Sequence, residues 1–291
     1  MARSLCILVA LLVVGGCSAS SSSVSDKEIK QLTEKLFSVD KHALSRLVHV
    51  DLQGKTYSSA TDDKAPKPLL SVNDAATKSA NPSVGLLAAL YDNYVPDCTV
   101  PEHETAQEKQ EQSALLDALI ATPVLSSTLS FLAGKGLVPS GAAAQKEFLR
   151  KLWFSLYSRG GGALGSSAFE HVFLGELKRG DVSGMHSWLF YNHEEEAGNV
   201  DYKGYIKKLS LGESGTLLKV RFEWLGANKP VNSLFVGASP ELEMSLYTLC
   251  FLARPDQKCH VSANGVNFYI QTWSFKLRDG FSTIGSAYPA L

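Results

Sequence analysis

A glycine-rich segment at residues 159–167, Arg-Gly-Gly-Gly-Ala-Leu-Gly-Ser-Ser, divides the chain into two parts with different hydrophobic patterns. Before it, apolar residues recur every three or four positions, as in amphipathic helices. After it, short segments alternate apolar and polar residues, as strands do. No Gly-Lys-Ser/Thr follows that would make the segment a phosphate-binding loop, so we interpret it as a flexible linker. The sequence therefore predicts an α+β fold, with an N-terminal helical part followed by antiparallel β-sheets.

Five helices are predicted before the linker. Their residue ranges are 26–39, 84–95, 106–120, 123–133 and 142–157. The intervening residues 54–83 are polar and rich in Pro, Ser and Asp, which predicts a loop.

Four strands are predicted after the linker, at residues 169–178, 200–207, 217–224 and 267–275. Asn264-Gly265 just before the last strand is typical of a two-residue hairpin. Ser239 as N-cap, followed by Pro240, predicts one helix that runs to about residue 253 and packs against the sheets.

The N-terminus has the pattern of a secretory signal peptide. Arg3 precedes ten apolar residues, 5–14, and small residues follow. Ten residues are too few to span a bilayer, so we expect residues 1–19 to be removed and the protein to be secreted without stable membrane insertion. A lipoprotein signal ending at Cys17 is an alternative that requires a bacterial host. The remaining chain predicts one domain over residues 24–291, with a helical lobe at about 26–158 and a catalytic α+β lobe at about 166–291.

Charge and cysteine content set further limits. The formal net charge is −1, so a polyanionic partner must be held locally and not by bulk charge. Cys98, Cys250 and Cys259 remain after the signal peptide, and three cysteines allow at most one intrachain disulfide. Cys250 and Cys259 are the nearest pair in sequence, but three buried thiols would explain the same pattern.

Candidate catalytic groups are few. The sequence contains no Gly-x-Ser-x-Gly, no His-Glu-x-x-His and no zinc-type Cys/His spacing. His171 lies in an apolar segment, His186 follows a glycine turn, and Lys229 precedes a proline. Taken one at a time, each of these residues is more often structural or solvated than catalytic. The acidic run at residues 194–196 is interpreted as a solvent-exposed face.

Eight segments in order give these residues more weight. They are FEHVFLGE, SGMHSW, VDYKGYI, KVRFEW, KPVNSLFVG, SPELEMSLYTLCFLARP, FYIQTWSF and STIGSAYP. Over about the last 125 residues the chain closely resembles the EndoU family of poly(U)-specific endoribonucleases, which includes the placental protein 11-like proteins.

The resemblance implies a role for each matching residue. It implies that the catalytic groups are His171, His186 and Lys229, with Gly184 as a backbone oxyanion donor. Ser233 and Tyr288 would bind the uridine, with Thr283 as a lesser candidate. The acids beside the first histidine, Glu170 and Glu176, would support catalysis. The family also implies a divalent cation, Mn²⁺ or Ca²⁺, for which the sequence offers no ligand cluster.

The implied reaction is cleavage of single-stranded RNA at uridines. The 2′-OH attacks the adjacent phosphate and leaves a 2′,3′-cyclic phosphate and a 5′-OH end. Histidine is the side chain that can act as base or acid near neutral pH. DNA lacks the 2′-OH and should not be cut. We expect a monomer. The alternative function is a secreted RNA-binding protein without physiological nuclease activity.

Overall fold

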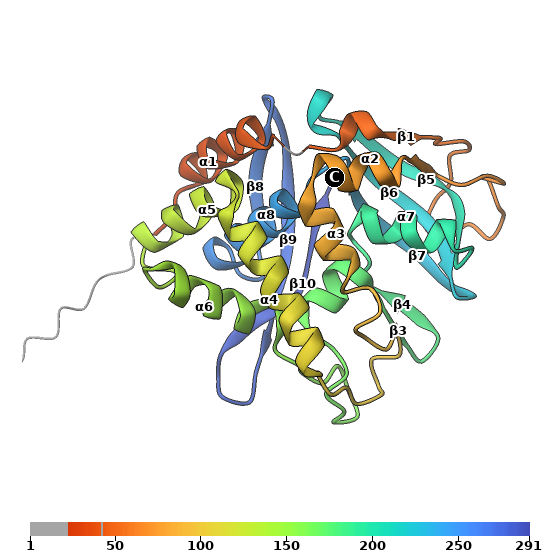
Figure 1. Cartoon of the computed structure of the whole chain (residues 1–291). Helices are drawn as coiled ribbons and strands as arrows, with labels where there is room; N and C mark the ends of the chain where they lie inside the picture. Colours follow the sequence, from red (N-terminus) through yellow and green to blue (C-terminus); the bar gives the residue numbers. More distant parts are fainter. Residues whose placement is uncertain (1–22, 42) are drawn as a thin grey trace, which may run out of the picture.

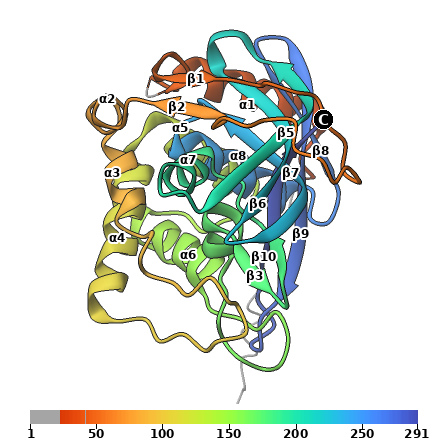
Figure 2. The same cartoon turned by 90° about the vertical axis from the view of Figure 1, so that its right-hand side faces the viewer.

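Helices gather on one side of the molecule and strands on the other. The computed structural model describes residues 23–41 and 43–291, so the predicted signal peptide lies outside the described residues. Figure 1 shows the two three-stranded sheets next to each other. Figure 2 shows that helices α3 (Pro82–Ala88) and α4 (Ala106–Ala121) lie on the opposite side from strands β8 (Lys258–Ala263) and β9 (Val266–Lys276).

The helical elements follow the chain in this order: α1 (Asp26–Val39), η1 (Ser45–Leu47), α2 (Asp74–Ala80), α3 (Pro82–Ala88), α4 (Ala106–Ala121), α5 (Pro123–Gly134), α6 (Ala142–Phe154), η2 (Glu170–Leu174), α7 (Trp188–Glu196), η3 (Gly212–Ser214) and α8 (Pro240–Ala253). Of the short ones, η2 is a single turn of π-helix and the other two are 3₁₀ turns.

The strands are β1 (Val48–Val50), β2 (Leu70–Val72), β3 (Glu176–Lys178), β4 (Asp181–Ser183), β5 (Val200–Ser210), β6 (Thr216–Trp224), β7 (Ala227–Val236), β8 (Lys258–Ala263), β9 (Val266–Lys276) and β10 (Ser282–Ala290). Every pair of these strands is antiparallel. The two larger sheets have the orders β5-β6-β7 and β10-β9-β8, and β7 contacts β10.

Local sequence explains where the helices begin. Ser25 and Glu28 form a capping box at the start of α1, and Thr105 and Glu108 form another at the start of α4. Ser239 accepts a hydrogen bond from the Leu242 N–H, which confirms the predicted start of α8.

Helix α8 lies at the centre of the core. Twelve of its residues are buried, and it contacts both α5 and β9. One continuous cluster of buried apolar residues includes residues of both the helical and the strand-rich parts of the chain. The structure thus matches the predicted α+β class, with strands around a packed helix.

Most predicted elements are confirmed. The helix at residues 26–39 has the predicted bounds, and the Asn264-Gly265 hairpin joins β8 to β9. The predicted helix at residues 84–95 is displaced, because α3 begins at Pro82 behind its Asn81 cap and ends at Ala88. Residues 54–83 are also not all loop, since they contain β2 and α2.

The strand predicted at residues 169–178 is wrong for its first half. Phe169 and Phe173 share one face of a strand by alternation, but they are also four residues apart, which is helical spacing. Their rings stack with centroids 5.1 Å apart. Ser167 and Glu170 exchange hydrogen bonds that cap this turn, and η2 forms in place of a strand.

The solvent-exposed face predicted at residues 194–196 is wrong for two of its three acids. Glu195 is buried and accepts hydrogen bonds from the backbone N–H groups of Leu69 and Leu70, at 2.7 and 2.9 Å. Glu194 is buried and accepts one from the Trp224 indole at 2.6 Å. Long-range partners that no local pattern reveals therefore satisfy both carboxylates.

In the described part of the chain no single helix is long and apolar enough to cross a membrane. Only α4 and α5 taken together reach that length and composition, and they are bent by 83° where they meet.

A disulfide joins Cys250 at the end of α8 to Cys259 on β8, while Cys98 is a buried free thiol. The bond closes a loop with a sequence separation of 9 residues, and restricting a loop of this size in the unfolded chain contributes about 2–3 kcal/mol. We expect dithiothreitol to lower the free energy of unfolding by that amount in urea titrations. The Cys98→Ala variant should show the same loss, whereas the Cys250→Ala/Cys259→Ala variant should be insensitive to the reductant. Equal stability of the wild type with and without reductant would contradict the bond.

Candidate active site

A pocket of about 380 Å³ opens where the two large sheets meet, between β7 and β10. Residues from η2, the β4–α7 connection, β6, β7 and β10 line it: His171, Ser183, Gly184, His186, Lys219, Lys229, Val231, Asn232, Ser233, Ser286 and Tyr288. The three predicted catalytic residues thus lie in one pocket, although they are 58 residues apart in sequence at the extremes (229 − 171).

Backbone hydrogen bonds hold the two histidine segments together. The Met185 N–H donates to the His171 carbonyl at 3.0 Å, and the His186 N–H donates to the Val172 carbonyl at 2.7 Å. Gly184 permits this contact. Its φ is +69°, and a Cβ at this position would lie 1.7 Å from the His171 carbonyl oxygen.

Both imidazoles are buried and each is held through Nδ1. The Nδ1 atom of His186 lies 3.0 Å from the Ser233 carbonyl oxygen. The Nδ1 atom of His171 lies 2.7 Å from Oε2 of Glu176. Because a carbonyl oxygen only accepts, Nδ1 of His186 carries the proton, and Nε2 of the neutral ring keeps its lone pair.

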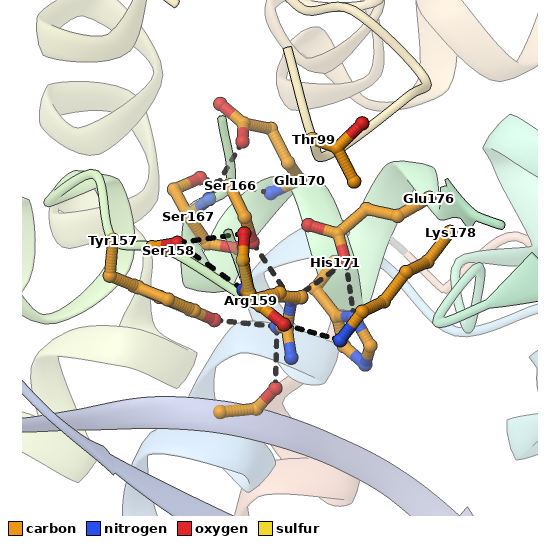
Figure 3. A network of polar contacts seen from close by, with 12 residues as sticks. Thr99, Tyr157, Ser158, Arg159, Ser166, Ser167, Glu170, His171, Glu176 and Lys178 are labelled. Carbon is orange, nitrogen blue, oxygen red and sulfur yellow. Dashed lines mark hydrogen bonds and ion pairs between the residues drawn. The ribbon is translucent and has the colours of Figure 1, made fainter. Parts of the chain in front are cut away.

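Glu176 forms the centre of a charged network behind His171 (Figure 3). The same Oε2 atom that contacts His171 lies 2.7 Å from Nε of Arg159. Arg159 is fixed in turn by the Gly285 carbonyl at 2.7 Å and the Ser166 hydroxyl at 2.9 Å. One oxygen of the carboxylate is therefore shared between the imidazole and the guanidinium.

A bulge in β7 directs Lys229 and its neighbours into the pocket. The register between β6 and β7 shifts between Val220 and Phe222, next to Pro230, where a strand tolerates proline. Beyond the bulge, Val231, Asn232 and Ser233 also line the pocket. Lys229 is buried, and its Nζ donates to the Val182 carbonyl at 3.2 Å.

Tyr288 closes the pocket from β10. Its ring stacks on His186 with centroids 5.0 Å apart and planes inclined by 30°. The indole N–H of Trp273 on β9 donates to the Tyr288 hydroxyl at 3.4 Å, and Trp273 is 48% exposed. An aromatic surface therefore borders the imidazole of His186.

Three predicted site residues do not line the pocket, namely Glu176, which contacts His171 from behind, and Thr283 and Glu170. Thr283 is fully buried and its hydroxyl donates to the Leu152 carbonyl of α6, so it takes part in packing. Glu170 turns away from the pocket, because its Oε2 accepts from the Ser167 N–H at 2.7 Å. Burial and the nearby Glu102 carboxylate raise the pKa of Glu170.

Several residues at the site were not predicted from the sequence. Arg159 begins the segment interpreted as a linker, and Lys219 lies within a strand whose pattern gave no functional signal. Asn232 was passed over, although its side chain donates to the Met185 carbonyl at 2.7 Å. Its position in the KPVNS segment, between Lys229 and Ser233, is the signal in the sequence that points to it.

Burial lowers the pKa of all three candidate catalytic groups. Burial, with the charge of Arg159, lowers the pKa of His171 to about 4. Burial, with the charge of Lys229, holds the pKa of His186 well below its ordinary value. Burial also lowers the pKa of Lys229 to about 8. At pH 7 both free imidazoles are neutral, while Lys229 keeps most of its charge.

The pocket does not resemble a metal site. Within residues 23–41 and 43–291, no group of three or more His, Cys, Asp or Glu is arranged to hold a metal ion. The nearest carboxylate, Glu176, is already bonded to His171 and Arg159. The residues of the pocket therefore do not fit a divalent cation.

Comparisons with known proteins agree with this geometry. A family model described as Endoribonuclease XendoU matches residues 28–289. "Uridylate-specific endoribonuclease EndoU" of Drosophila melanogaster is 40% identical over 265 residues, which cover 90% of this chain and 82% of the relative. "Uridylate-specific endoribonuclease D" of Xenopus laevis is 34% identical over 275 residues, covering 92% and 90%.

A solved structure is also similar over almost its whole length. It is described as "The structure of XendoU: a splicing independent snoRNA processing endoribonuclease" and has a TM-score of 0.75 at 32% identity. The match covers 91% of this chain and 97% of that one, which confirms the fold class. The family model matches most of the chain, and the alignments with these two relatives, each above 30% identity, cover most of this chain and most of each relative. The chain therefore belongs to the XendoU family of endoribonucleases.

Proposed function

We propose that the protein cleaves single-stranded RNA at uridines, with the 2′-OH as nucleophile and a 2′,3′-cyclic phosphate and a 5′-OH end as products. The observation that carries this proposal is the presence of two imidazoles and one ammonium in a single pocket, each imidazole held through Nδ1. This arrangement leaves both Nε2 atoms for proton transfer. DNA lacks the nucleophile and is not cut.

His186 acts as the general base in this proposal. Its Nδ1 proton is directed to the Ser233 carbonyl, and its low pKa keeps Nε2 unprotonated at pH 7. It therefore accepts the proton of the 2′-OH as the oxygen attacks phosphorus.

His171 acts as the general acid and returns a proton to the departing 5′-oxygen. Glu176 beside Nδ1 stabilises the imidazolium, whereas burial and Arg159 oppose it. The phosphodiester anion that enters the pocket adds negative charge next to both rings and raises their pKa values. His171 is thus protonated in the complex more readily than in the free protein.

Lys229 stabilises the additional negative charge of the phosphorane, in a buried position where such an interaction is stronger than in water. The Gly184 N–H is a further donor at the pocket wall. Ser233 and the ring of Tyr288 are placed to bind and stack the uracil, the usual way in which proteins bind an unstacked base.

The relatives' names support uridine as the base, since both are uridylate-specific endoribonucleases. RNA binding without cleavage is the competing function, but it does not require two histidines held in this way. We also propose, from the N-terminal sequence, that the protein is secreted. A monomer stays a separate prediction. A dependence on Mn²⁺ or Ca²⁺ stays a prediction of the family resemblance, which assays with and without EDTA would test.

We expect His171→Ala and His186→Ala each to reduce cleavage of a uridine-containing oligonucleotide by about 10²–10⁴-fold, because each removes one proton-transfer group. His260→Ala is the matched control, since this histidine is exposed on β8. Quenched-fluorophore assays would measure the rates. Full activity in either pocket variant would rule out the proposed mechanism.

The pH dependence should depend on Lys229. Its positive charge lowers the pKa of His186, so Lys229→Gln should raise that pKa, and Lys229→Arg should keep it low because arginine stays charged. Protonated His186 cannot act as base. The acid limb of kcat/KM should therefore move to higher pH in Lys229→Gln only.

NMR titration of the imidazole Cε1–H signals measures the same shift in the free protein without any turnover. A His186 pKa that is unchanged in Lys229→Gln would contradict the proposed electrostatic coupling.

Base selection should depend on Ser233. Ser233→Ala removes a hydroxyl at the pocket wall, and we expect the ratio of kcat/KM for uridine over cytidine to fall about tenfold, which corresponds to roughly 1.4 kcal/mol for one hydrogen bond. Ser282→Ala, at an exposed position of β10, serves as the control. An unchanged ratio would show that Ser233 does not select the base.

A further inference from the structure

Three polar residues form a row across the sheet that borders the pocket. Lys207 on β5 is directly opposite Lys219 on β6, and Lys219 is directly opposite Ser233 on β7. Directly opposite residues of antiparallel strands point to the same face of the sheet. Lys219 and Ser233 both line the pocket, so Lys207 lies on the same face, one strand farther out.

The two lysines place like charges opposite each other, which destabilises a sheet. Elsewhere on β5 the fold neutralises such a charge, since Lys203 lies within 4.0 Å of carboxylate oxygens of Asp201, Asp63 and Glu223. Lys207 is exposed, and over the described residues neither Lys207 nor Lys219 forms an ion pair with a carboxylate side chain. Lys219 reaches the Leu291 backbone oxygen at 3.4 Å.

The row leads from the pocket outward. Neighbouring strands are about 4.8 Å apart, so the Lys207 backbone lies roughly 10 Å from that of Ser233. Over this distance the side chains of Lys207 and Lys219 can contact one or two phosphates of the RNA backbone. These phosphates would flank the nucleotide whose base is bound at Ser233. A lysine ammonium is a point charge suited to this contact.

We propose that Lys207 and Lys219 form a binding track for backbone phosphates of the RNA that flanks the uridine. The track rests on the proposed function, because it places the uridine at Ser233. It explains how a chain with a formal net charge of −1 holds a polyanion, through a local row of cations that form no ion pair with a carboxylate side chain.

Lys208 provides a matched control. It is the next residue on β5, is also exposed, and is opposite Leu218, so it points to the other face of the sheet. Lys207→Gln and Lys208→Gln therefore make the same change of charge on the same strand, and only the first removes a cation from the track.

The test measures binding apart from cleavage. A single-stranded RNA of twelve nucleotides with one 2′-deoxyuridine as its only uridine lacks the nucleophile at the target site, and fluorescence anisotropy gives its Kd at several salt concentrations. For Lys207→Gln we expect a Kd about fivefold higher at low salt. We also expect the slope of log Kd against log salt to be smaller by about 0.7, the value for one lost contact in a single strand. Lys208→Gln should match the wild type.

Cleavage assays distinguish this track from the site itself. For a uridine dinucleotide, which is too short to reach Lys207, kcat and KM should be unchanged in Lys207→Gln, while KM for the twelve-nucleotide RNA should rise without a change in kcat. Equal effects of the two glutamine variants on Kd, or an equal rise in KM for both substrates, would overturn the track. Absence of cleavage by the wild type, with the anisotropy results as expected, would overturn the proposed function and leave the track in place.

Discussion

The close approach of Gly184 to the His171 carbonyl is the contact on which the pocket depends. The following residues, Met185 and His186, donate backbone hydrogen bonds to the η2 turn, and these bonds set the two imidazoles at the same pocket. A side chain at residue 184 would prevent this approach, and the positive φ at Gly184 turns the chain toward α7. Strands β7 and β10 meet at the same place, so Lys229 and Tyr288 line the pocket next to these backbone contacts.

The π-helical turn contributes to the same geometry. In η2 the Gly175 N–H donates to the carbonyl of Glu170, five residues earlier, at 2.6 Å. Such wider turns are often found at functional sites, because they change the direction of the following residues. Here the chain passes directly from the turn into β3, whose first residue, Glu176, is bonded to the His171 side chain. One short segment therefore carries both the histidine and the carboxylate that orients it.

Elements with strong local signals could be predicted from the sequence. Helix α1 has both a capping box and helical spacing, and the β8–β9 hairpin has Asn264-Gly265 at its turn. The segment at residues 169–174 could not be predicted, because Phe169 and Phe173 fit both a strand with period two and a helical turn. Only the stacking of the phenyl rings and the Ser167 cap decide between the two. The buried position of Glu195 depends on the backbone of β2, which lies 125 residues away in sequence. The three candidate catalytic residues were assigned from motif resemblance. Arg159 could not be assigned in this way, because its partners lie in three separate segments.

The electrostatics of the pocket follow from the same contacts. Four basic groups, Arg159, His171, His186 and Lys229, lie close together with Glu176 as the carboxylate in contact with His171. Burial disfavours the charged forms of the two histidines and of the lysine. Both imidazoles are neutral in the free protein, so the charged groups of the site are Lys229, Arg159 and the Glu176 carboxylate. An entering phosphodiester supplies the missing negative charge and makes protonation of the imidazoles more favourable. In the proposed mechanism His171 takes up the proton that it donates when the substrate binds, while His186 stays unprotonated as the base. The protonation of the general acid is thereby coupled to the presence of the RNA backbone.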